Sequence, residues 1–234
     1  MSENLQKNKN LVKNVFDAVY DKYDLMNDLM SLGAHRYWKN NFIKMMNPYP
    51  GQSLIDVGCG TGDIAKLFSE ATNGQSKILS VDPNDNMIEK GKNRLSSLKN
   101  ITWQINRAEN LKVKTESFDF YTISFGLRNT SNIQKALSEA YRVLKRGGRF
   151  MCLEFSKIEN SNLNYLYKEY SKLIPIMGKY VIGDSKPYDY LVKTIDKFLN
   201  QEELIDMLRE TNFTNCEYTN INAGIVSVHS GWKI

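Results

Sequence analysis

The sequence predicts an α/β protein built on a doubly wound, mostly parallel β-sheet of about seven strands. Two observations carry this prediction. Between residues 53 and 155, short β-rich runs alternate with helical patterns, and parallel strands need such crossover helices. Near the end of the chain, two strand-like runs are joined by a short turn, which predicts an antiparallel hairpin at one edge of the sheet. A length of 234 residues favours a single domain over residues 1–234.

The first part of the chain, residues 11–46, is predicted to form N-terminal helices. Apolar residues recur at steps of three and four along residues 11–30, opposite a stripe of aspartates, which indicates an amphipathic helix. Gly33 interrupts the pattern. A second helix is predicted from His35 to Met46, where Asn47 and Pro48 stop it.

The central part, residues 53–156, carries the alternation of strands and helices. A turn at Gly147-Gly148 is expected to precede the last strand of this part. The predicted strands are 53–57, 77–81, 101–105, 118–125 and 149–155, and the predicted helices are 63–71, 84–98 and about 132–144.

The alternation lapses between residues 160 and 200, a segment longer than an ordinary α/β connection. We interpret it as a helical insertion or lid, interrupted by Pro175, Gly178, Gly183 and Pro187. Residues 201–234 then supply a helix over 201–210 and the hairpin, with strands predicted at 215–221 and 224–229 around Asn222-Ala223.

Composition excludes several classes of protein. The first ten residues are polar, and no run approaches the roughly 18 apolar residues that a membrane span needs. Three cysteines without C-x-x-C spacing fit neither a disulfide framework nor a zinc site, so we expect a reducing cytoplasm and no metal. The net charge of +5 comes from interspersed acids and bases and by itself selects no partner.

The most specific local signal is the run Asp56-Val57-Gly58-Cys59-Gly60-Thr61-Gly62-Asp63, which follows a predicted strand and opens a helix. Glycines at 58 and 60 let the backbone turn sharply and approach a ligand. Asp82 ends the second predicted strand, where a carboxylate can accept both hydroxyls of a ribose. Together they predict a nucleoside cofactor, the alternative being a purely structural tight turn.

The identity of the nucleoside follows from position 63. A dinucleotide fingerprint starting at Gly58 requires glycine there, and Asp63 would face a pyrophosphate unfavourably. The D-x-G-x-G-x-G arrangement resembles motif I of class I methyltransferases, in which this loop holds the amino-acid end of S-adenosylmethionine. Cys59 is read as a small turn residue rather than a nucleophile.

The residues after the fourth predicted strand, Ser124-Phe125-Gly126-Leu127-Arg128-Asn129, should meet the substrate because ligands bind beyond the carboxyl ends of parallel strands. Nucleic-acid amino-methyltransferases usually carry Asn or Asp before Pro-Pro and an aromatic residue here. The absence of that pattern argues against a nucleic-acid partner. Arg128 and Asn129 instead suit an oxyanion or hydroxyls, although Arg128 equally fits a surface ion pair.

At this point nearly the whole chain resembles the ubiquinone and menaquinone biosynthesis C-methyltransferases. The family more often has Gly in place of Cys59, Asn in place of Arg107 and Pro in place of Leu199. The matching runs are 23–31 (YDLMNDLMS), 35–39 (HRYWK), 60–63 (GTGD), 123–129 (ISFGLRN), 141–145 (YRVLK), 153–156 (LEFS) and Ala223-Gly224 with His229, Gly231 and Lys233.

The resemblance implies a Rossmann-like fold and methyl transfer from S-adenosylmethionine to a ring carbon of a lipophilic polyprenyl quinol, which is a benzoquinol, a demethylmenaquinol or both. It implies that Arg128 stabilises the phenolate, that Asn129 holds a ring oxygen, and that Tyr23 reaches over the ring unless it faces the core. The cofactor contacts it implies are Thr61, Asp82, Arg107, Ala108 and Ser124, beside the glycines of the loop.

The partners follow from the same resemblance. The apolar residues of the insertion form either part of the core or a groove for the prenyl tail or a membrane contact. A location in the cytoplasm, peripheral at the inner face of the membrane, is compatible with the basic charge. A biosynthetic complex and a homodimer are the other associations expected. Two other functions remain open: another small-molecule methyltransferase, or a non-catalytic partner that binds S-adenosylmethionine.

Overall fold

The structure is a computed structural model that describes residues 27–28, 31, 33–159, 161–182 and 186–234. Most of the helix predicted over residues 11–30, and with it Tyr23, lies outside these described residues. The second N-terminal helix is present as α3 (Ala34–Met46), one residue longer than predicted, and it ends at Asn47 in a left-handed conformation.

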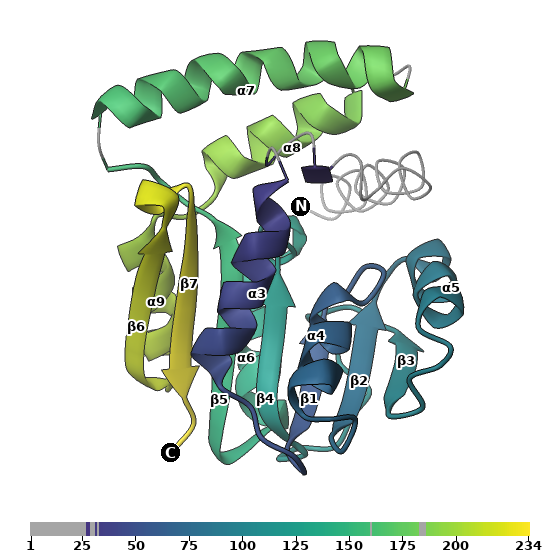
Figure 1. Ribbon diagram of the computed structural model, residues 1–234. Helices are drawn as coiled ribbons and strands as arrows, with labels where there is room; N and C mark the ends of the chain where they lie inside the picture. Colours follow the sequence, from purple (N-terminus) through teal and green to yellow (C-terminus); the bar gives the residue numbers. More distant parts are fainter. Residues whose placement is uncertain (1–26, 29–30, 32, 160, 183–185) are drawn as a thin grey trace.

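The described chain forms a seven-stranded sheet in the order β3-β2-β1-β4-β5-β7-β6 (Figure 1). The first five strands pair in parallel, whereas β7 lies antiparallel to both β5 and β6. This topology confirms the predicted fold class. The strands are β1 (Ser53–Val57), β2 (Lys77–Asp82), β3 (Ile101–Ile105), β4 (Phe118–Ser124), β5 (Leu144–Phe155), β6 (Thr214–Ile221) and β7 (Val226–Trp232).

Helices cover both faces of the sheet, because alternate residues of each buried strand point to opposite sides. On one face, α3 and α4 pack on Leu54 and Phe120; on the other, α6 and α9 pack on Ile55 and Tyr121. The helices that flank the sheet in this way are α4 (Asp63–Ala71), α5 (Asp85–Arg94), α6 (Ile133–Val143) and α9 (Gln201–Glu210), besides α3.

Two predicted boundaries in the central part are wrong by more than one residue. Helix α5 ends at Arg94, four residues before the predicted end. Strand β5 begins at Leu144 rather than at Arg149, since the Gly147-Gly148 pair forms an irregularity within the strand and not a turn before it. Gly147 has a φ of 77° and donates its N–H to the carbonyl of Lys233, so the extra residues stay attached to the sheet.

The insertion forms two helices, α7 (Ser161–Ile182) and α8 (Lys186–Lys197), which lie beyond the carboxyl ends of the parallel strands (Figure 1). The interruption predicted at Pro175 and Gly178 was wrong, because α7 runs through both. Proline costs a helix one backbone hydrogen bond, and here α7 is retained by packing on α8, with Ile174 buried in the core.

The C-terminal part matches its prediction closely. Helix α9 spans the predicted residues and starts with a capping box between Asn200 and Glu203. The hairpin is present, although β7 begins two residues later than predicted and extends to Trp232. Gly224 instead ends a short 3-10 helix, η3 (Asn222–Gly224), in which Asn222 and Ala223 have positive φ, and Ile225 caps that helix before β7 begins.

Candidate active site

The glycine-rich loop joins β1 to α4 at the carboxyl edge of the sheet. Gly58, Gly60 and Gly62 have φ of 65°, 54° and 89°, a left-handed conformation in which a Cβ is strained. The loop is tied to the neighbouring strand by the Cys59 N–H, which donates to the carbonyl of Val81 at 3.1 Å. Burial raises the pKa of the Cys59 thiol well above its usual range, which fits a turn residue rather than a nucleophile.

Asp82 lies at the end of β2, directly beside this loop. One carboxylate oxygen accepts the N–H of Gly60 and the other accepts the N–H of Asn84, each at 2.9 Å. Burial raises the pKa of Asp82 to about 6, against the lowering effect of these two N–H donors. The backbone therefore holds the carboxylate rigidly, and its remaining lone pairs are left for hydroxyl donors.

A pocket opens between the loop, α3 and the end of β4. Two of its polar atoms, Oδ2 of Asp56 and Oγ of Ser124, are buried without a hydrogen-bond partner among the described residues. Burial raises the pKa of Asp56 to about 7, although the Thr122 hydroxyl opposes the shift. The described residues that line the pocket are Lys39, Asp56, Gly58, Cys59, Thr61, Asp63, Ile64, Ser124 and Phe125.

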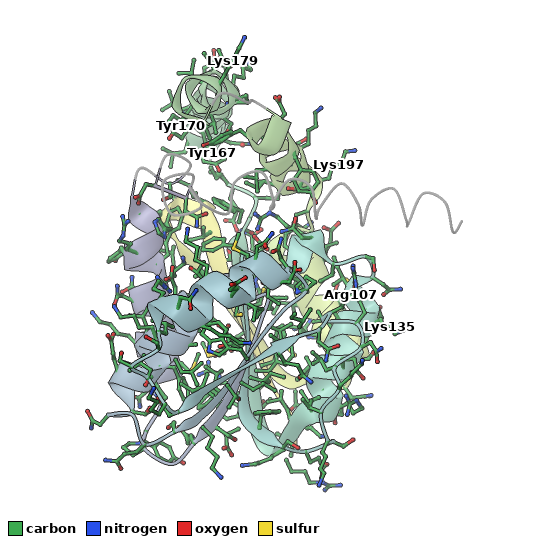
Figure 2. All side chains as sticks on the ribbon, turned by 90° about the vertical axis from the view of Figure 1, so that its right-hand side faces the viewer. Arg107, Lys135, Tyr167, Tyr170, Lys179 and Lys197 are labelled. Atoms are coloured by element: carbon green, nitrogen blue, oxygen red, sulfur yellow. The ribbon has the colours of Figure 1, made fainter. Side chains whose placement is uncertain are left out.

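The pair Arg107-Ala108 follows β3 and does not line this pocket. The backbone nevertheless passes close to Asp82, whose carbonyl accepts the N–H of Asn106 at 3.2 Å. Ala108 is buried, whereas the Arg107 side chain is 42% exposed and lies 3.6 Å from Glu109 (Figure 2). A contact from position 107 to a cofactor at Asp82 would therefore come most directly from its backbone.

Arg128 lies in the 3-10 turn η2 (Leu127–Asn129) that follows β4. Its side chain is 4% exposed, and Nη1 donates to the carbonyl of Phe125 at 2.7 Å and to Oε1 of Glu154 at 2.6 Å. The pairing of β4 with β5 sets Leu153 opposite Ser124, which brings Glu154 to the start of the turn. The ion pair is thus buried rather than at the surface, and the Arg128 Nε has no partner among the described residues.

Asn129 connects the same turn to the insertion. Its Oδ1 accepts the hydroxyl of Tyr190, on α8, at 3.2 Å. Tyr167 of α7 is on the side of that helix facing the body of the molecule (Figure 2), and burial raises the pKa of its hydroxyl to about 12. The two insertion helices therefore cover the turn that carries Arg128 and Asn129 with protonated tyrosines.

An aromatic cluster lies beside the turn, formed by Trp38, Phe125 and Phe155. The ring centroids are 5.1 Å apart for Phe125 and Phe155 and about 6 Å apart for the two pairs with Trp38. The guanidinium carbon of Arg128 is 5.5 Å from the Phe155 centroid. Arg128 is thus held by a carboxylate, a carbonyl and an aromatic ring.

Several site residues were not predicted individually from the sequence, namely Lys39, Glu154 and Tyr190. Lys39 and Glu154 fall within runs that match the family, but the runs do not state what each side chain contacts. Tyr190 lies outside those runs, and only the fold brings it to Asn129.

The glycine-rich loop, Asp82 and the adjoining pocket together suit a nucleoside sulfonium ligand. Left-handed glycines allow close approach, Asp82 presents a fixed acceptor, and the unpartnered oxygens of Asp56 and Ser124 suit a cationic, hydrogen-bonding group. In the part of the chain that the structure describes, no group of three His, Cys, Asp or Glu side chains could hold a metal ion.

Comparison with protein families decides the affiliation. The model of the ubiE/COQ5 methyltransferase family matches residues 3–233. The chain belongs to this family. The methyltransferase uses S-adenosylmethionine as its methyl donor, in agreement with the geometry of the glycine-rich loop and Asp82.

Curated relatives match over nearly the whole chain. The ubiquinone/menaquinone biosynthesis C-methyltransferase UbiE of Rhizobium etli is 46% identical over 230 residues, covering 96% of this chain and 89% of the relative. UbiE of Rickettsia bellii is 46% identical, with 97% and 94% covered. The mitochondrial 2-methoxy-6-polyprenyl-1,4-benzoquinol methylase of Dictyostelium discoideum is 41% identical, with 99% and 84% covered.

Solved structures share the fold at lower identity. A possible histamine N-methyltransferase from Thermotoga maritima has a TM-score of 0.67 at 21% identity, covering 95% of this chain and 99% of that one. Phosphoethanolamine N-methyltransferase 2 of Haemonchus contortus, solved with S-adenosyl-L-methionine, has a TM-score of 0.64 at 17% identity, with 83% and 52% covered. These likenesses show that the methyltransferase has the fold of this enzyme class.

Proposed function

We propose that this methyltransferase transfers a methyl group to a ring carbon of a polyprenyl benzoquinol, a demethylmenaquinol, or both. The names of the curated relatives support both ring classes. The observation that carries the proposal is the turn after β4, where Arg128 and Asn129 lie beside the cofactor pocket, fixed by Glu154 and Tyr190. A rigid cation next to an amide suits a ring that carries oxygens.

The chemistry requires the ring carbon to become nucleophilic. An adjacent ring hydroxyl must lose its proton, so that electron density moves into the ring, and Arg128 stabilises the resulting phenolate. Arg128 acts as a hydrogen-bond donor and not as the base; a water that it orients accepts the proton. Asn129 holds a ring oxygen. S-adenosylmethionine supplies the electrophilic methyl group.

Alignment of the two reactants, together with exclusion of water from the site, supplies the rest of the increase in the rate of methyl transfer. The transfer joins two opposite charges, so hydration of either reactant opposes it. Helix α8 packs on the turn, α7 packs on α8, and Trp38, Phe125 and Phe155 give the turn an apolar wall. We assign to Tyr23 a contact with the ring face; this residue lies outside the described part of the structure.

The cofactor contacts are assigned from the same geometry. We assign the ribose hydroxyls to Asp82, the methionine part to Gly58, Gly60 and Thr61, and hydrogen bonds near the reacting end to Ser124. We assign Arg107 and Ala108 to the adenine side; the backbone before them, where the Asn106 N–H donates to the carbonyl of Asp82, supports this.

We also propose that the enzyme works at a membrane surface, where its lipophilic substrate resides. Among the described residues no helix is long and apolar enough to cross a membrane. The outer face of α7 instead exposes Leu166, Leu173 and Ile176, between 52% and 62% each, next to Lys172 and Lys179. An apolar stripe flanked by lysines is typical of a helix that lies in an anionic lipid surface.

The decisive experiment measures methyl transfer from labelled S-adenosylmethionine to short-tailed demethylated benzoquinol and naphthoquinol under reducing conditions. We expect Arg128→Ala to lose about 100-fold or more in kcat, while its affinity for S-adenosylhomocysteine changes little. Arg146→Ala, which removes an exposed arginine of the β5 irregularity, is the matched control and should retain activity. If wild type methylates neither quinol although both are reduced and dissolved, the substrate assignment is wrong.

A further inference from the structure

Lys39 is a buried lysine that reaches the cofactor loop from α3. It is 7% exposed, lines the pocket beside Thr61 and Ser124, and places Nζ 2.7 Å from Oδ2 of Asp63. Burial of a lysine is costly unless the charge is compensated. The question is whether Asp63 is its only partner.

Asp63 already has a second cation. Nη2 of Arg94 lies 2.6 Å from Oδ1 of Asp63 and also donates to the carbonyl of Thr61 at 2.8 Å. Asp63 is in addition the first residue of α4, where the helix dipole favours a negative charge. Although burial opposes it, Lys39 and Arg94 together lower the pKa of Asp63 strongly. One carboxylate therefore has two cations, and Lys39 is the one that faces the pocket.

The pocket lining is otherwise poor in positive charge. Lys39 is the single basic side chain among the described residues that line it, alongside the carboxyls of Asp56 and Asp63. The methionine part of the cofactor carries both an ammonium and a carboxylate. The unpartnered oxygen of Asp56 can accept from the ammonium but would repel a carboxylate, and the Ser124 hydroxyl can donate to a carboxylate but supplies no positive charge.

We propose that Lys39 binds the carboxylate of the methionine part of S-adenosylmethionine, so that α3 contributes directly to cofactor recognition. The ammonium group of Lys39 has three donors, of which Asp63 takes one. The cofactor carboxylate takes a second donor, and Asp63 keeps its ion pair with Arg94. The loop and α3 are thereby joined through the ligand as well as through Asp63.

The test compares two ligands that differ only in this carboxylate: S-adenosylmethionine and its decarboxylated analogue. Their dissociation constants are measured by calorimetry on the full chain. We expect wild type to bind S-adenosylmethionine at least about tenfold more tightly than the analogue, because the carboxylate adds one charge-assisted hydrogen bond. Lys39→Met should lose affinity for S-adenosylmethionine and bind the analogue almost as wild type does, whereas Lys39→Arg should retain most of the preference.

Arg94→Gln provides the matched control, because it removes the other cation of Asp63 and does not line the pocket. We expect the preference for S-adenosylmethionine to persist in this variant even if both affinities change. The proposal is overturned if wild type binds the two ligands equally, a result that needs no variant to fold. It is also overturned if Lys39→Met weakens both ligands by the same factor, which is the signature of a purely structural ion pair.

Discussion

At the scale of single residues, we expect the protonation state of the Asp82 carboxylate to make cofactor affinity depend on pH. Its pKa is raised to about 6, and hydroxyl donors of a ribose favour the ionised form. Binding therefore lowers this pKa, so we expect affinity for S-adenosylhomocysteine to fall as the pH decreases from about 7 to about 5 and to level off above. Calorimetric titrations across this range measure the effect.

The variant Asp82→Asn distinguishes the contribution of Asp82 to the pH dependence of binding from that of Asp56, whose pKa is about 7. An amide cannot accept on both atoms, and one of the N–H groups of Gly60 and Asn84 loses its acceptor. We expect the dissociation constant to rise by about 10- to 100-fold at pH 8. The part of the pH dependence centred near 6 should disappear; its persistence would show that another group produces it.

The buried pair of Arg128 and Glu154 couples catalysis to stability. The two side chains are 4% and 1% exposed, so removal of one charge leaves the other buried without a counter-ion. We expect Glu154→Ala to lower the free energy of unfolding by about 3–5 kcal/mol, measured by urea denaturation.

An exposed ion pair provides the comparison for this prediction. Arg209 and Asp206 on α9 lie 3.1 Å apart but are 59% and 67% exposed. Because solvent screens them, Arg209→Ala should change the free energy of unfolding by less than about 1 kcal/mol. Equal losses in the two variants would mean that the burial of Glu154 does not determine its contribution.

At the scale of elements, α8 packs on η2 and is joined to it by a hydrogen bond from Tyr190. The hydroxyl of Tyr190 donates to Oδ1 of Asn129. Asn129 is the last residue of η2, and Thr130 after it has an extended backbone. Without this bond the amide keeps, among the described residues, only the 3.4 Å hydrogen bond from its Nδ2 to the carbonyl of Phe125, and it is less firmly held toward the ring oxygen that we propose it binds. We expect Tyr190→Phe to lower kcat about 2- to 10-fold and to leave the affinity for S-adenosylhomocysteine unchanged.

The same helix contains a matched control. Tyr188 is fully buried, and its hydroxyl has no partner among the described residues. Removing an unpaired buried hydroxyl is neutral or stabilising, so Tyr188→Phe should retain kcat. If both variants lost activity equally, the role of Tyr190 would lie in packing of α8 and not in its bond to Asn129.

At the scale of the whole molecule, α7 forms an outer surface above the carboxyl edge of the sheet (Figure 1). Its inner side carries Ile174 in the core, and its outer side carries the apolar stripe of Leu166, Leu173 and Ile176. Glu169 lies within the stripe, but its charge is paired with Lys172 at 2.6 Å. This pair also neutralises Lys172, so Lys179 supplies the positive charge next to the stripe for the proposed contact with an anionic surface.

We expect the protein to bind vesicles that contain phosphatidylglycerol and to bind neutral phosphatidylcholine vesicles more weakly, as measured by sedimentation. Leu166→Glu should reduce binding about tenfold, since it places a charge in the stripe. Tyr49→Glu is the control, because Tyr49 is 65% exposed but precedes β1, at the opposite edge of the sheet. Equal binding of both variants and wild type would contradict the assignment of α7 to the membrane.

Much of the fold could be predicted from the sequence because its elements depend on local patterns. Strands β1 and β3 and helix α9 have the bounds that their periodicity and caps predict. The predictions that were wrong concern residues whose conformation depends on tertiary contacts rather than on local patterns. Pro175 should end a helix by local rules, yet packing holds α7 together, and Gly147 should begin a turn, yet hydrogen bonds to the C-terminal residues keep it in β5.

The sequence by itself determined the sheet, the cofactor loop with Asp82 and the position of Arg128 after a strand, since each is a short run with a fixed spacing. Only the tertiary structure decided the partners of these residues. Lys39 meets Asp63 from 24 residues away, Glu154 meets Arg128 across 26, and Tyr190 meets Asn129 across 61. Such contacts depend on strand register and helix packing, which no local pattern encodes.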